Sequence, residues 1–420
     1  MRSAASAVTR LRYLSPFERF LWLFDLTHPM HFSLAAEIEG EVPIETMRKA
    51  LRSLQQRHPL LRASIERDDN GMLYFREARD TQIPLRVLSE NGRWQLERAL
   101  VDELATPFGE APASLLRATL LQEDAACSLI LTVHHAIADG LAVTYLLRDL
   151  MQALDGAVLP PLAIPPSQEG ALGIVDDGDG RSNYLTAVGA LPADRRSSDT
   201  GSGALPLPAV TLRKLSRALT TWLLERSRAE NTTATGALVS ALASALGGCS
   251  RPHGVRPKAT ISVGVSKRSQ LHVGEQCGFF AGGVPLDVEL GDGAGFWARA
   301  RDVKSALARE QSGEDLVSSR AALGEALAEV RSPRQAERFG LNIFASDFVV
   351  SNLGALPFET RYSNRSLRSV FGPALLLGMP GTNMLGVATI DNEIALTYSS
   401  YAPVPNVLEQ IEKRLVRACG

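Results

Sequence analysis

One short stretch of the sequence combines residue types that can move a proton. Residues 134–140 read His-His-Ala-Ile-Ala-Asp-Gly, between an apolar, strand-like run over residues 127–133 and an amphipathic run over residues 141–154. Histidine suits general-base catalysis because its unperturbed pKa lies near neutral pH. Neighbouring side chains on a strand point to opposite faces, so His134 and His135 cannot both face one substrate. We expect one of them to face a cavity and the other to face the packed interior.

Other interpretations of this stretch are open. An arbitrary pair of histidines beside a turn is usually buried and satisfied by its neighbours, but the complete string after an apolar strand favours an active site. A metal hydrolase that uses His134, His135 and Asp139 is a further alternative. Adjacent histidines on a strand diverge, and no third histidine follows at helical spacing, so we expect neither a metal site nor a cofactor.

The string resembles the His-His-x-x-x-Asp-Gly motif of the condensation-domain and chloramphenicol-acetyltransferase-like acyltransferase superfamily. This superfamily includes condensation domains of peptide synthetases, polyketide-associated acyltransferases and wax ester synthases. In organisation, the chain most resembles the stand-alone polyketide-associated acyltransferases. Weaker similarities to family segments follow in order along almost the whole chain, at residues 14–23, 30–32, 50–62, 232–238, 262–268 and 350–354.

The resemblance implies a role for each residue of the motif. His135 matches the second histidine and is the expected general base, while His134 faces inward and supports the strand. The family's aspartate turns away from the substrate and pairs with an arginine from the other half, which makes Asp139 structural and Arg268 its expected partner. Arg268 could equally be an ordinary strand-end cation. Gly140 would let the backbone or the donor approach closely where a Cβ would obstruct.

Two later segments are weaker candidates. Ser351 and Asn352 could bring polar side chains to the substrate channel, although a simple exit from a strand into a turn fits equally well. The Gly/Pro-rich residues 378–382 lie where family members line the acceptor side, but a plain loop is favoured there. Asp347-Phe348 is followed by two valines, so the Asp-Phe-Gly-Trp element of the plant acyltransferases is missing and the plant branch is disfavoured.

Bulk properties limit the class of protein. The chain has 420 residues, 45% of them hydrophobic, and a net charge of −2, which indicates two domains or one bilobal unit and gives no reason to expect nucleic acid as a partner. None of the four cysteines has CxxC spacing, which argues against a zinc site, a redox pair or a disulfide scaffold. Residues 1–12 do not read as a signal peptide, and no apolar run is long enough to span a membrane. We therefore expect a cytoplasmic protein, most simply a monomer.

The periodicity predicts a mixed α/β (α+β) fold. Ser15 is the expected N-cap of a helix that starts with Pro16. Helices are predicted at residues 15–26, 44–57, 94–104, 212–228, 233–246, 298–307, 318–329 and 405–418, the fifth of them buried between layers. Strands are predicted at residues 32–38, 60–66, 72–75, 115–121, 128–133, 258–265, 347–351, 374–377, 384–390 and 393–399.

Loop composition divides the chain into parts. Residues 158–208 are rich in Pro, Gly, Asp and Ser and are interpreted as a crossover linker, although a surface insertion would have the same composition. Residues 1–157 and 209–420 would then be the N-terminal and C-terminal lobes. The resemblance implies that both are chloramphenicol-acetyltransferase-like lobes, with the active-site channel and His135 at their interface.

The expected function is acyl transfer from a carrier-protein or CoA thioester to an alcohol, forming an ester in polyketide, lipid or other secondary metabolism. A thioester is already activated, so a base and a site for the oxyanion suffice. The sequence agrees, since it has no G-x-S-x-G elbow and no cysteine near the two histidines. An amide-forming condensation enzyme, and a non-catalytic module of the same fold that recruits carrier proteins, are the alternatives.

Overall fold

The structure, a computed structural model, describes most of the chain. The described residues are 9–174, 208–247, 257–292, 295–311, 316–377 and 382–420, except 79, 90, 91, 111, 113, 123 and 124 and the side chain of residue 311. Most of the predicted linker and most of the Gly/Pro-rich segment at 378–382 lie outside them. The proposed boundaries of the two lobes remain predictions.

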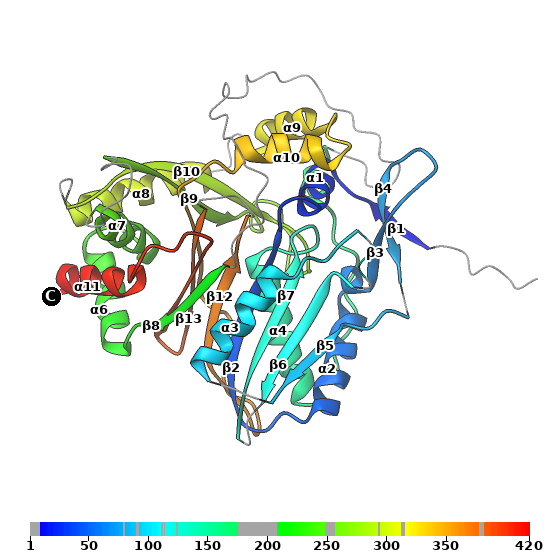
Figure 1. Cartoon of the computed structure of the whole chain (residues 1–420), viewed down its shortest axis with the longest axis horizontal. Helices are drawn as coiled ribbons and strands as arrows, with labels where there is room; N and C mark the ends of the chain where they lie inside the picture. The colour runs from blue at the N-terminus through cyan, green and yellow to red at the C-terminus, as the bar shows by residue number, and fades with distance from the viewer. Residues whose placement is uncertain are drawn as a thin grey trace, which may run out of the picture.

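Two sheets stand side by side at the centre of the molecule (Figure 1). In order across the first sheet lie β12 (Ser366–Leu375), β2 (His31–Glu39), β7 (Ala126–His134), β6 (Leu116–Gln122) and β5 (Leu85–Leu88). In order across the second lie β10 (Ala281–Glu289), β9 (Lys258–Ser266), β11 (Phe348–Ala355), β13 (Asn383–Ile390), β14 (Glu393–Ser400) and β8 (Ala209–Lys214). A small third sheet contains β1 (Arg10–Tyr13), β4 (Leu73–Glu77) and β3 (Ala63–Arg67).

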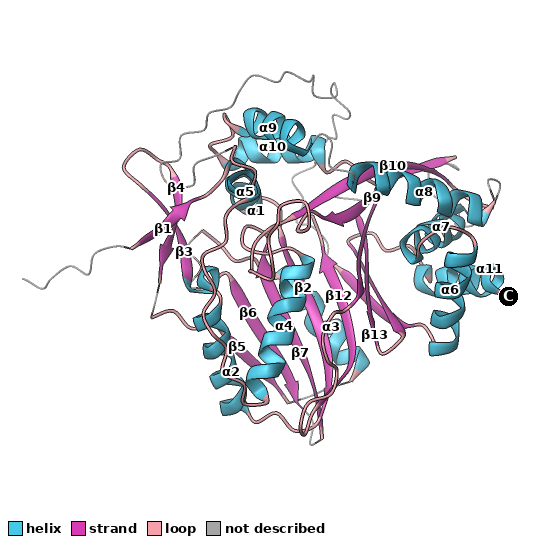
Figure 2. Ribbon diagram, turned by 180° about the vertical axis from the view of Figure 1, so that it is seen from behind, coloured by secondary structure: helices cyan, strands magenta, loops and turns pink. Residues whose placement is uncertain are grey.

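Helices cover the outer faces of both large sheets. In the first lobe, α2 (Ile44–Arg57) and α4 (Gly140–Leu154) lie on one face of the sheet and α3 (Arg93–Ala105) lies on the other (Figures 1 and 2). Beside the second sheet lie α6 (Arg217–Ala229), α7 (Ala234–Gly247), α8 (Phe296–Gln311) and α11 (Val407–Cys419). Between the lobes, a group of short helices comprises α1 (Pro16–Asp25), α5 (Gln168–Ala171), α9 (Leu316–Leu327) and α10 (Pro333–Ile343).

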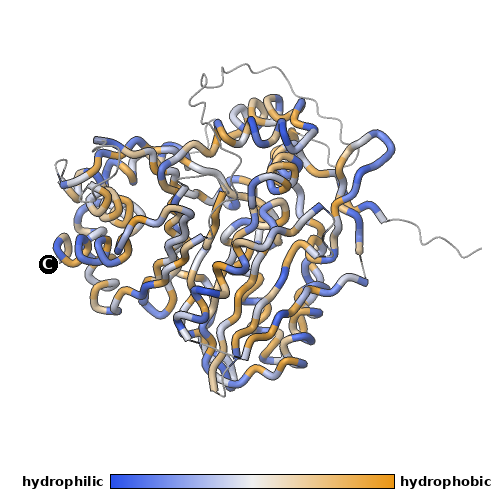
Figure 3. Tube along the Cα trace, viewed as in Figure 1, coloured by the Kyte–Doolittle hydropathy of each residue, from blue (hydrophilic) through white to orange (hydrophobic). Residues whose placement is uncertain are grey.

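Apolar residues follow the central strands of both sheets, so each lobe has its own core (Figure 3). Helix α7 is buried along nearly its whole length against α8 and α11, as its apolar sequence predicts. No described helix has both the length and the apolar character needed to cross a bilayer.

Strand β12 ties the two lobes together. It comes late in the chain, yet it pairs antiparallel with β2 at the edge of the first sheet. Its backbone also lies against the second sheet, where the Pro373 carbonyl oxygen is so close that a Cβ on Gly386 would lie 2.1 Å from it. The hydroxyl of Ser399 donates to the Leu375 carbonyl at 3.0 Å. The predicted two-lobed architecture is confirmed, but this exchange of a strand between the lobes was not predicted.

Most predicted elements appear where the periodicity places them. The N-terminus of α1 forms the expected cap, in which the Ser15 hydroxyl accepts from the Glu18 N–H at 3.3 Å and the Glu18 carboxylate accepts from the Ser15 N–H at 2.9 Å. One prediction is wrong in its first part, since residues 212–228 were expected to form one helix. Residues up to 214 belong instead to strand β8, whose backbone pairs with β14, and α6 starts at Arg217 behind the Ser216 cap.

Candidate active site

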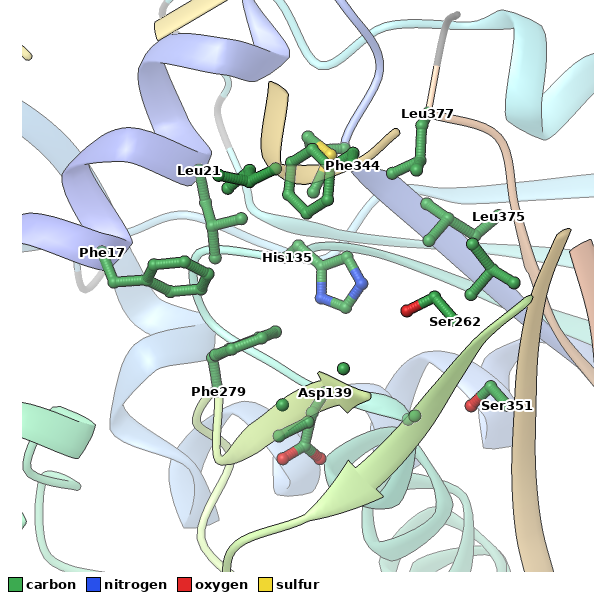
Figure 4. Close-up of a pocket in the computed structure, with 18 of the residues that line it drawn as sticks. Phe17, Leu21, His135, Asp139, Ser262, Phe279, Phe344, Ser351, Leu375 and Leu377 are labelled. Carbon is green, nitrogen blue, oxygen red and sulfur yellow. The ribbon is translucent and has the colours of Figure 1, made fainter. Parts of the chain in front are cut away.

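A cavity of about 400 Å³ lies between the two lobes. Its walls come from α1, β2, β9, β10, β11, α9 and β12, and most of its lining side chains are apolar. Figure 4 shows His135 in the middle of this space, surrounded by Phe17, Leu21, Phe279, Phe344, Leu375 and Leu377.

The backbone and one carbonyl hold His135 at the end of β7. Its N–H donates to the Met30 carbonyl at 3.1 Å, which extends the pairing of β7 with β2 by one residue. Its Nδ1 lies 2.9 Å from the carbonyl oxygen of Ala138. A carbonyl can only accept, so Nδ1 carries the hydrogen and Nε2 of the neutral ring is an acceptor. Among the described residues, no hydrogen bond engages Nε2, and the imidazole packs against Phe32 and Phe279 with ring centroids 4.4 and 5.3 Å away.

Burial among these rings lowers the pKa of His135 to about 4, against the opposing influence of the Ala138 carbonyl and the Asp139 carboxylate. The ring is therefore neutral at pH 7. A neutral imidazole with a free Nε2 in an apolar cavity can accept a proton from a hydroxyl or amine placed beside it.

This shift makes a prediction about pH. Protonation would occupy Nε2, so kcat/KM is expected to fall on the acid side with a midpoint near 4 instead of near the ordinary histidine value of 6.5. Between pH 6.5 and pH 4, His135 is mostly protonated in the unfolded chain but mostly neutral in the folded protein. This residue therefore lowers the free energy of unfolding as the pH falls from 6.5 to 4. The measurement is kcat/KM against pH, with circular dichroism at each pH to confirm folding. A midpoint near 6.5 in folded protein would contradict the lowered pKa of His135, and an acid limb that persists in His135→Ala would assign the titration to another group.

His134 faces the opposite side of β7, as predicted, and is fully buried. Its Nδ1 accepts from the Ala136 N–H at 3.0 Å, which directs Nε2 toward Asp25 at 3.4 Å. His31, the partner of His134 across the strands, approaches the other carboxylate oxygen of Asp25 at 3.6 Å. Burial alone would raise the pKa of Asp25, but His134 and His31 together hold it far below its usual range. Asp25 is thus a buried anion between two histidines, behind the cavity.

Asp139 and Arg268 meet at the junction of the lobes, at the predicted contact. The Arg268 Nη2 donates to the two carboxylate oxygens at 3.1 and 3.3 Å, and both side chains are buried. Asp139 also caps α4 by accepting from the Ala142 N–H at 2.7 Å, and it accepts from the Phe280 N–H at 2.8 Å. Its carboxylate points away from the His135 ring (Figure 4). This geometry fits a residue that positions the turn.

Of the remaining predicted residues, two line the cavity and one does not. Gly140 lines the cavity. A Cβ at this position would lie 2.7 Å from the Leu353 side chain, so the neighbour that packs closely against this glycine is Leu353. Ser351 lines the cavity together with Ser262, whose hydroxyl was not predicted to do so (Figure 4).

The prediction that Asn352 lines the channel is wrong. Asn352 follows Ser351 on the strand and faces the other side, where its amide donates to the Thr235 hydroxyl at 3.0 Å and accepts from the Gly354 N–H at 2.9 Å.

A second correction concerns the cysteines. Cys277 is far from the histidines in sequence, but its thiol donates to the Ile137 carbonyl inside the motif turn at 3.1 Å. Burial raises the pKa of this thiol to about 12, so it remains protonated and is a poor nucleophile at neutral pH. Among the described residues, no three His, Cys, Asp or Glu side chains are arranged to hold a metal ion.

Comparison with known proteins gives a partial sequence match. The family description "Condensation domain" matches residues 14–166. A linear gramicidin synthase polypeptide from Brevibacillus parabrevis is 33% identical over 177 residues, which are 38% of this chain and 4% of that protein. Gramicidin S synthase 2 from Brevibacillus brevis is 33% identical over 129 residues, 30% of this chain and 3% of that protein. The chain therefore spans only a small fraction of the length of these curated relatives.

Solved structures match over nearly the whole chain. Polyketide synthase associated protein 5 from Mycobacterium tuberculosis has a TM-score of 0.66 at 16% identity, covering 98% of this chain and 99% of that one. The trichothecene 15-O-acetyltransferase of Fusarium sporotrichioides has a TM-score of 0.66 at 12% identity, covering 100% and 96%. At these identities the likeness concerns the fold. Together, these comparisons show a condensation-domain match over residues 14–166 and, over nearly the whole chain, the two-lobed fold of the condensation-domain-like structures.

Proposed function

We propose that this protein transfers an acyl group from a thioester, carried by a carrier protein or by CoA, to an alcohol acceptor and forms an ester. His135 is the general base in this proposal. Its Nε2 takes the proton of the acceptor hydroxyl, the alcohol oxygen bonds to the thioester carbon, and the collapse of the tetrahedral intermediate expels the thiolate, which takes up the proton. In this proposal His134, Asp139 and Arg268 support the strand end and the turn that hold His135 in place.

The orientation of His135 is the observation that carries the proposal. The Ala138 carbonyl fixes its tautomer, burial keeps the ring neutral, and Nε2 is left without a partner among the described residues in a cavity between the lobes. The apolar lining, including Leu375 and Leu377, suits an acyl chain. One of the structures that share this fold is named as a trichothecene 15-O-acetyltransferase, which supports the choice of an acyl transfer to an alcohol oxygen.

Amide formation is the second candidate, because residues 14–166 match a condensation domain and the two curated relatives named above are gramicidin synthases. The same base would deprotonate an amine instead of a hydroxyl, so the base does not decide between the two products. A carrier-recruiting module without catalysis would bind the thioester and leave it intact.

The test is a mass-spectrometric screen of purified protein with several acyl-CoA and acyl-carrier thioesters against paired alcohols and amines of matching carbon skeleton. We expect ester products that depend on His135. Amide products alone would favour the condensation alternative. Tight binding of a carrier protein without turnover of any pair would contradict the enzymatic proposal and favour the recruiting module.

A further inference from the structure

Helix α9 places an arginine without a partner in the wall of the cavity. Arg320 is 7% exposed and lines the cavity beside Phe17. Among the described residues, no hydrogen bond or ion pair engages its guanidinium, and its Nη1 is enclosed without a partner. Its one specific contact is with the face of the Phe17 ring, whose centroid is 5.1 Å from Cζ.

Such an arginine is unusual because a guanidinium carries five N–H donors and stays protonated in proteins. A buried donor without an acceptor is unfavourable because it has lost its hydrogen bonds to water, and a charged donor is more unfavourable still. Burial lowers the pKa of Arg320, the direction expected for a cation that has lost water without gaining a partner. The structure of the free protein therefore leaves this charge uncompensated.

The two nearest acids do not neutralise it. Glu169 on α5 is itself buried, and burial raises the pKa of its carboxyl against the opposing influence of Arg320. Both of its carboxylate oxygens are enclosed without a hydrogen-bond partner, so it makes no direct ion pair with Arg320. Glu310 is bound elsewhere, since it accepts from the buried Lys267 ammonium at 2.8 Å. Figure 2 shows α5 beside α1 and below α9 and α10. Residues of α1 and α9, Arg320 among them, line the cavity.

We propose that Arg320 binds an oxyanion of the substrate, a phosphate or a carboxylate, at one end of the cavity that contains His135. The planar fork of a guanidinium matches both groups with two parallel hydrogen bonds. This proposal names a recognition element of the same site and therefore rests on the proposed function.

The position of Arg320 fits an anion that is remote from the reacting atoms. Its guanidinium stacks on Phe17, Phe17 contacts Phe279 with centroids 5.3 Å apart, and Phe279 contacts His135 at 5.3 Å. Two aromatic rings thus separate the cation from the base. An extended substrate can reach both groups at once, with its reacting carbon at His135 and its anionic end at Arg320.

Two sources of the anion give different results in a binding experiment. A phosphate would belong to the donor arm, so CoA is compared with pantetheine, which lacks phosphate. A carboxylate would belong to the acyl chain, so acyl-pantetheines of equal length that end in methyl or in carboxylate are compared. Calorimetric dissociation constants are measured for the wild type, Arg320→Met, Glu169→Gln and His135→Ala.

The wild type is expected to prefer the anionic member of one pair by about 10–100-fold, the value of one charge-assisted contact. Arg320→Met is expected to reduce this preference to near one while the neutral ligand binds as before. Glu169→Gln, a matched change in a buried neighbour, is expected to keep the preference. Equal binding of both members of both pairs by the wild type, or an unchanged preference in Arg320→Met, would overturn the proposal. A loss of the preference in Glu169→Gln equal to that in Arg320→Met would also overturn it, because the preference would then depend on the local packing and not on the charge of Arg320.

Stability provides an independent measurement. Replacing an uncompensated buried charge by an apolar side chain of similar length is neutral or stabilising, so Arg320→Met is expected to melt at or above the wild-type temperature. A large loss of melting temperature would show a structural arginine and overturn the proposal. Should the protein transfer no acyl group while the anion preference persists in both the wild type and His135→Ala, the proposed function would fail and the anion site would stand.

Discussion

Replacing His135 by alanine is expected to lower kcat/KM for acyl transfer about 10²–10⁴-fold, the usual contribution of a positioned general base. The side chain removed makes one hydrogen bond, to the Ala138 carbonyl, and it lines a cavity, so little stability should be lost. Binding of the donor should change little, because the apolar walls of the cavity remain. The measurement is steady-state kinetics with one thioester and one alcohol, together with a thermal melt.

His134→Ala is the matched control one residue earlier. It removes one partner of the buried Asp25 carboxylate, which keeps His31 and the Met30 N–H, and losing one contact of a buried charge typically costs about 1–3 kcal/mol. We therefore expect a lower melting temperature and poorer expression, with near-normal kinetics for the protein that folds. A well-folded, inactive His134→Ala beside a fully active His135→Ala would reverse the two roles. Normal turnover in both would place the chemistry elsewhere.

The sequence made the two faces of β7 predictable because they follow from strand geometry alone. Adjacent residues on a strand point apart, so one histidine had to be buried if the other lined a cavity. The Asp139–Arg268 pair is different. Its residues are 129 positions apart, and only the resemblance to a family, not the spacing, indicated that they would meet.

Asp25 was missed although its sequence carries a signal. An acidic residue in the last turn of a helix opposes the helix dipole, and α1 has no basic residue there. Such an aspartate requires a specific partner, and the structure supplies His134 and His31 from two neighbouring strands. The signal shows that partners exist, but their identity depends on how β2 and β7 pair.

Elements at the edges of sheets were harder to predict. Strand β10 begins with Ala281-Gly282-Gly283 and contains Pro285, residues that lower strand propensity. It is the outermost strand of its sheet and pairs on one side only, with β9, a position where a proline is tolerated. Strand β12 is longer than predicted because its first residues pair with β2, a contact made across more than 300 positions. Helix α10 had a readable start, the Ser332 cap followed by Pro333, but it was not predicted.

Asp139→Ala is expected to destabilise the protein by about 3–5 kcal/mol, the typical cost of breaking a buried ion pair on one side. The loss has three parts. The cap of α4 disappears, the Phe280 N–H loses its acceptor, and Arg268 loses its carboxylate partner but keeps the backbone carbonyls of the loop at residues 274–278. Because Asp139 holds the turn and does not touch the imidazole, folded variant protein should keep substantial turnover.

A double-mutant cycle separates the pair from the cap. Arg268→Met removes the cation and leaves the cap of α4 intact, and the double variant no longer contains a buried charge without its partner. The double variant is therefore expected to be more stable than the sum of the single changes predicts, by about 0.5–3 kcal/mol. Denaturant midpoints of the four proteins measure this coupling, and kcat/KM of each tests the chemistry. Strictly additive losses would show that the two side chains do not interact. An unchanged midpoint with abolished turnover in Asp139→Ala would assign Asp139 to the reaction itself, because a residue that only positions the turn cannot lose activity without loosening the junction that it holds.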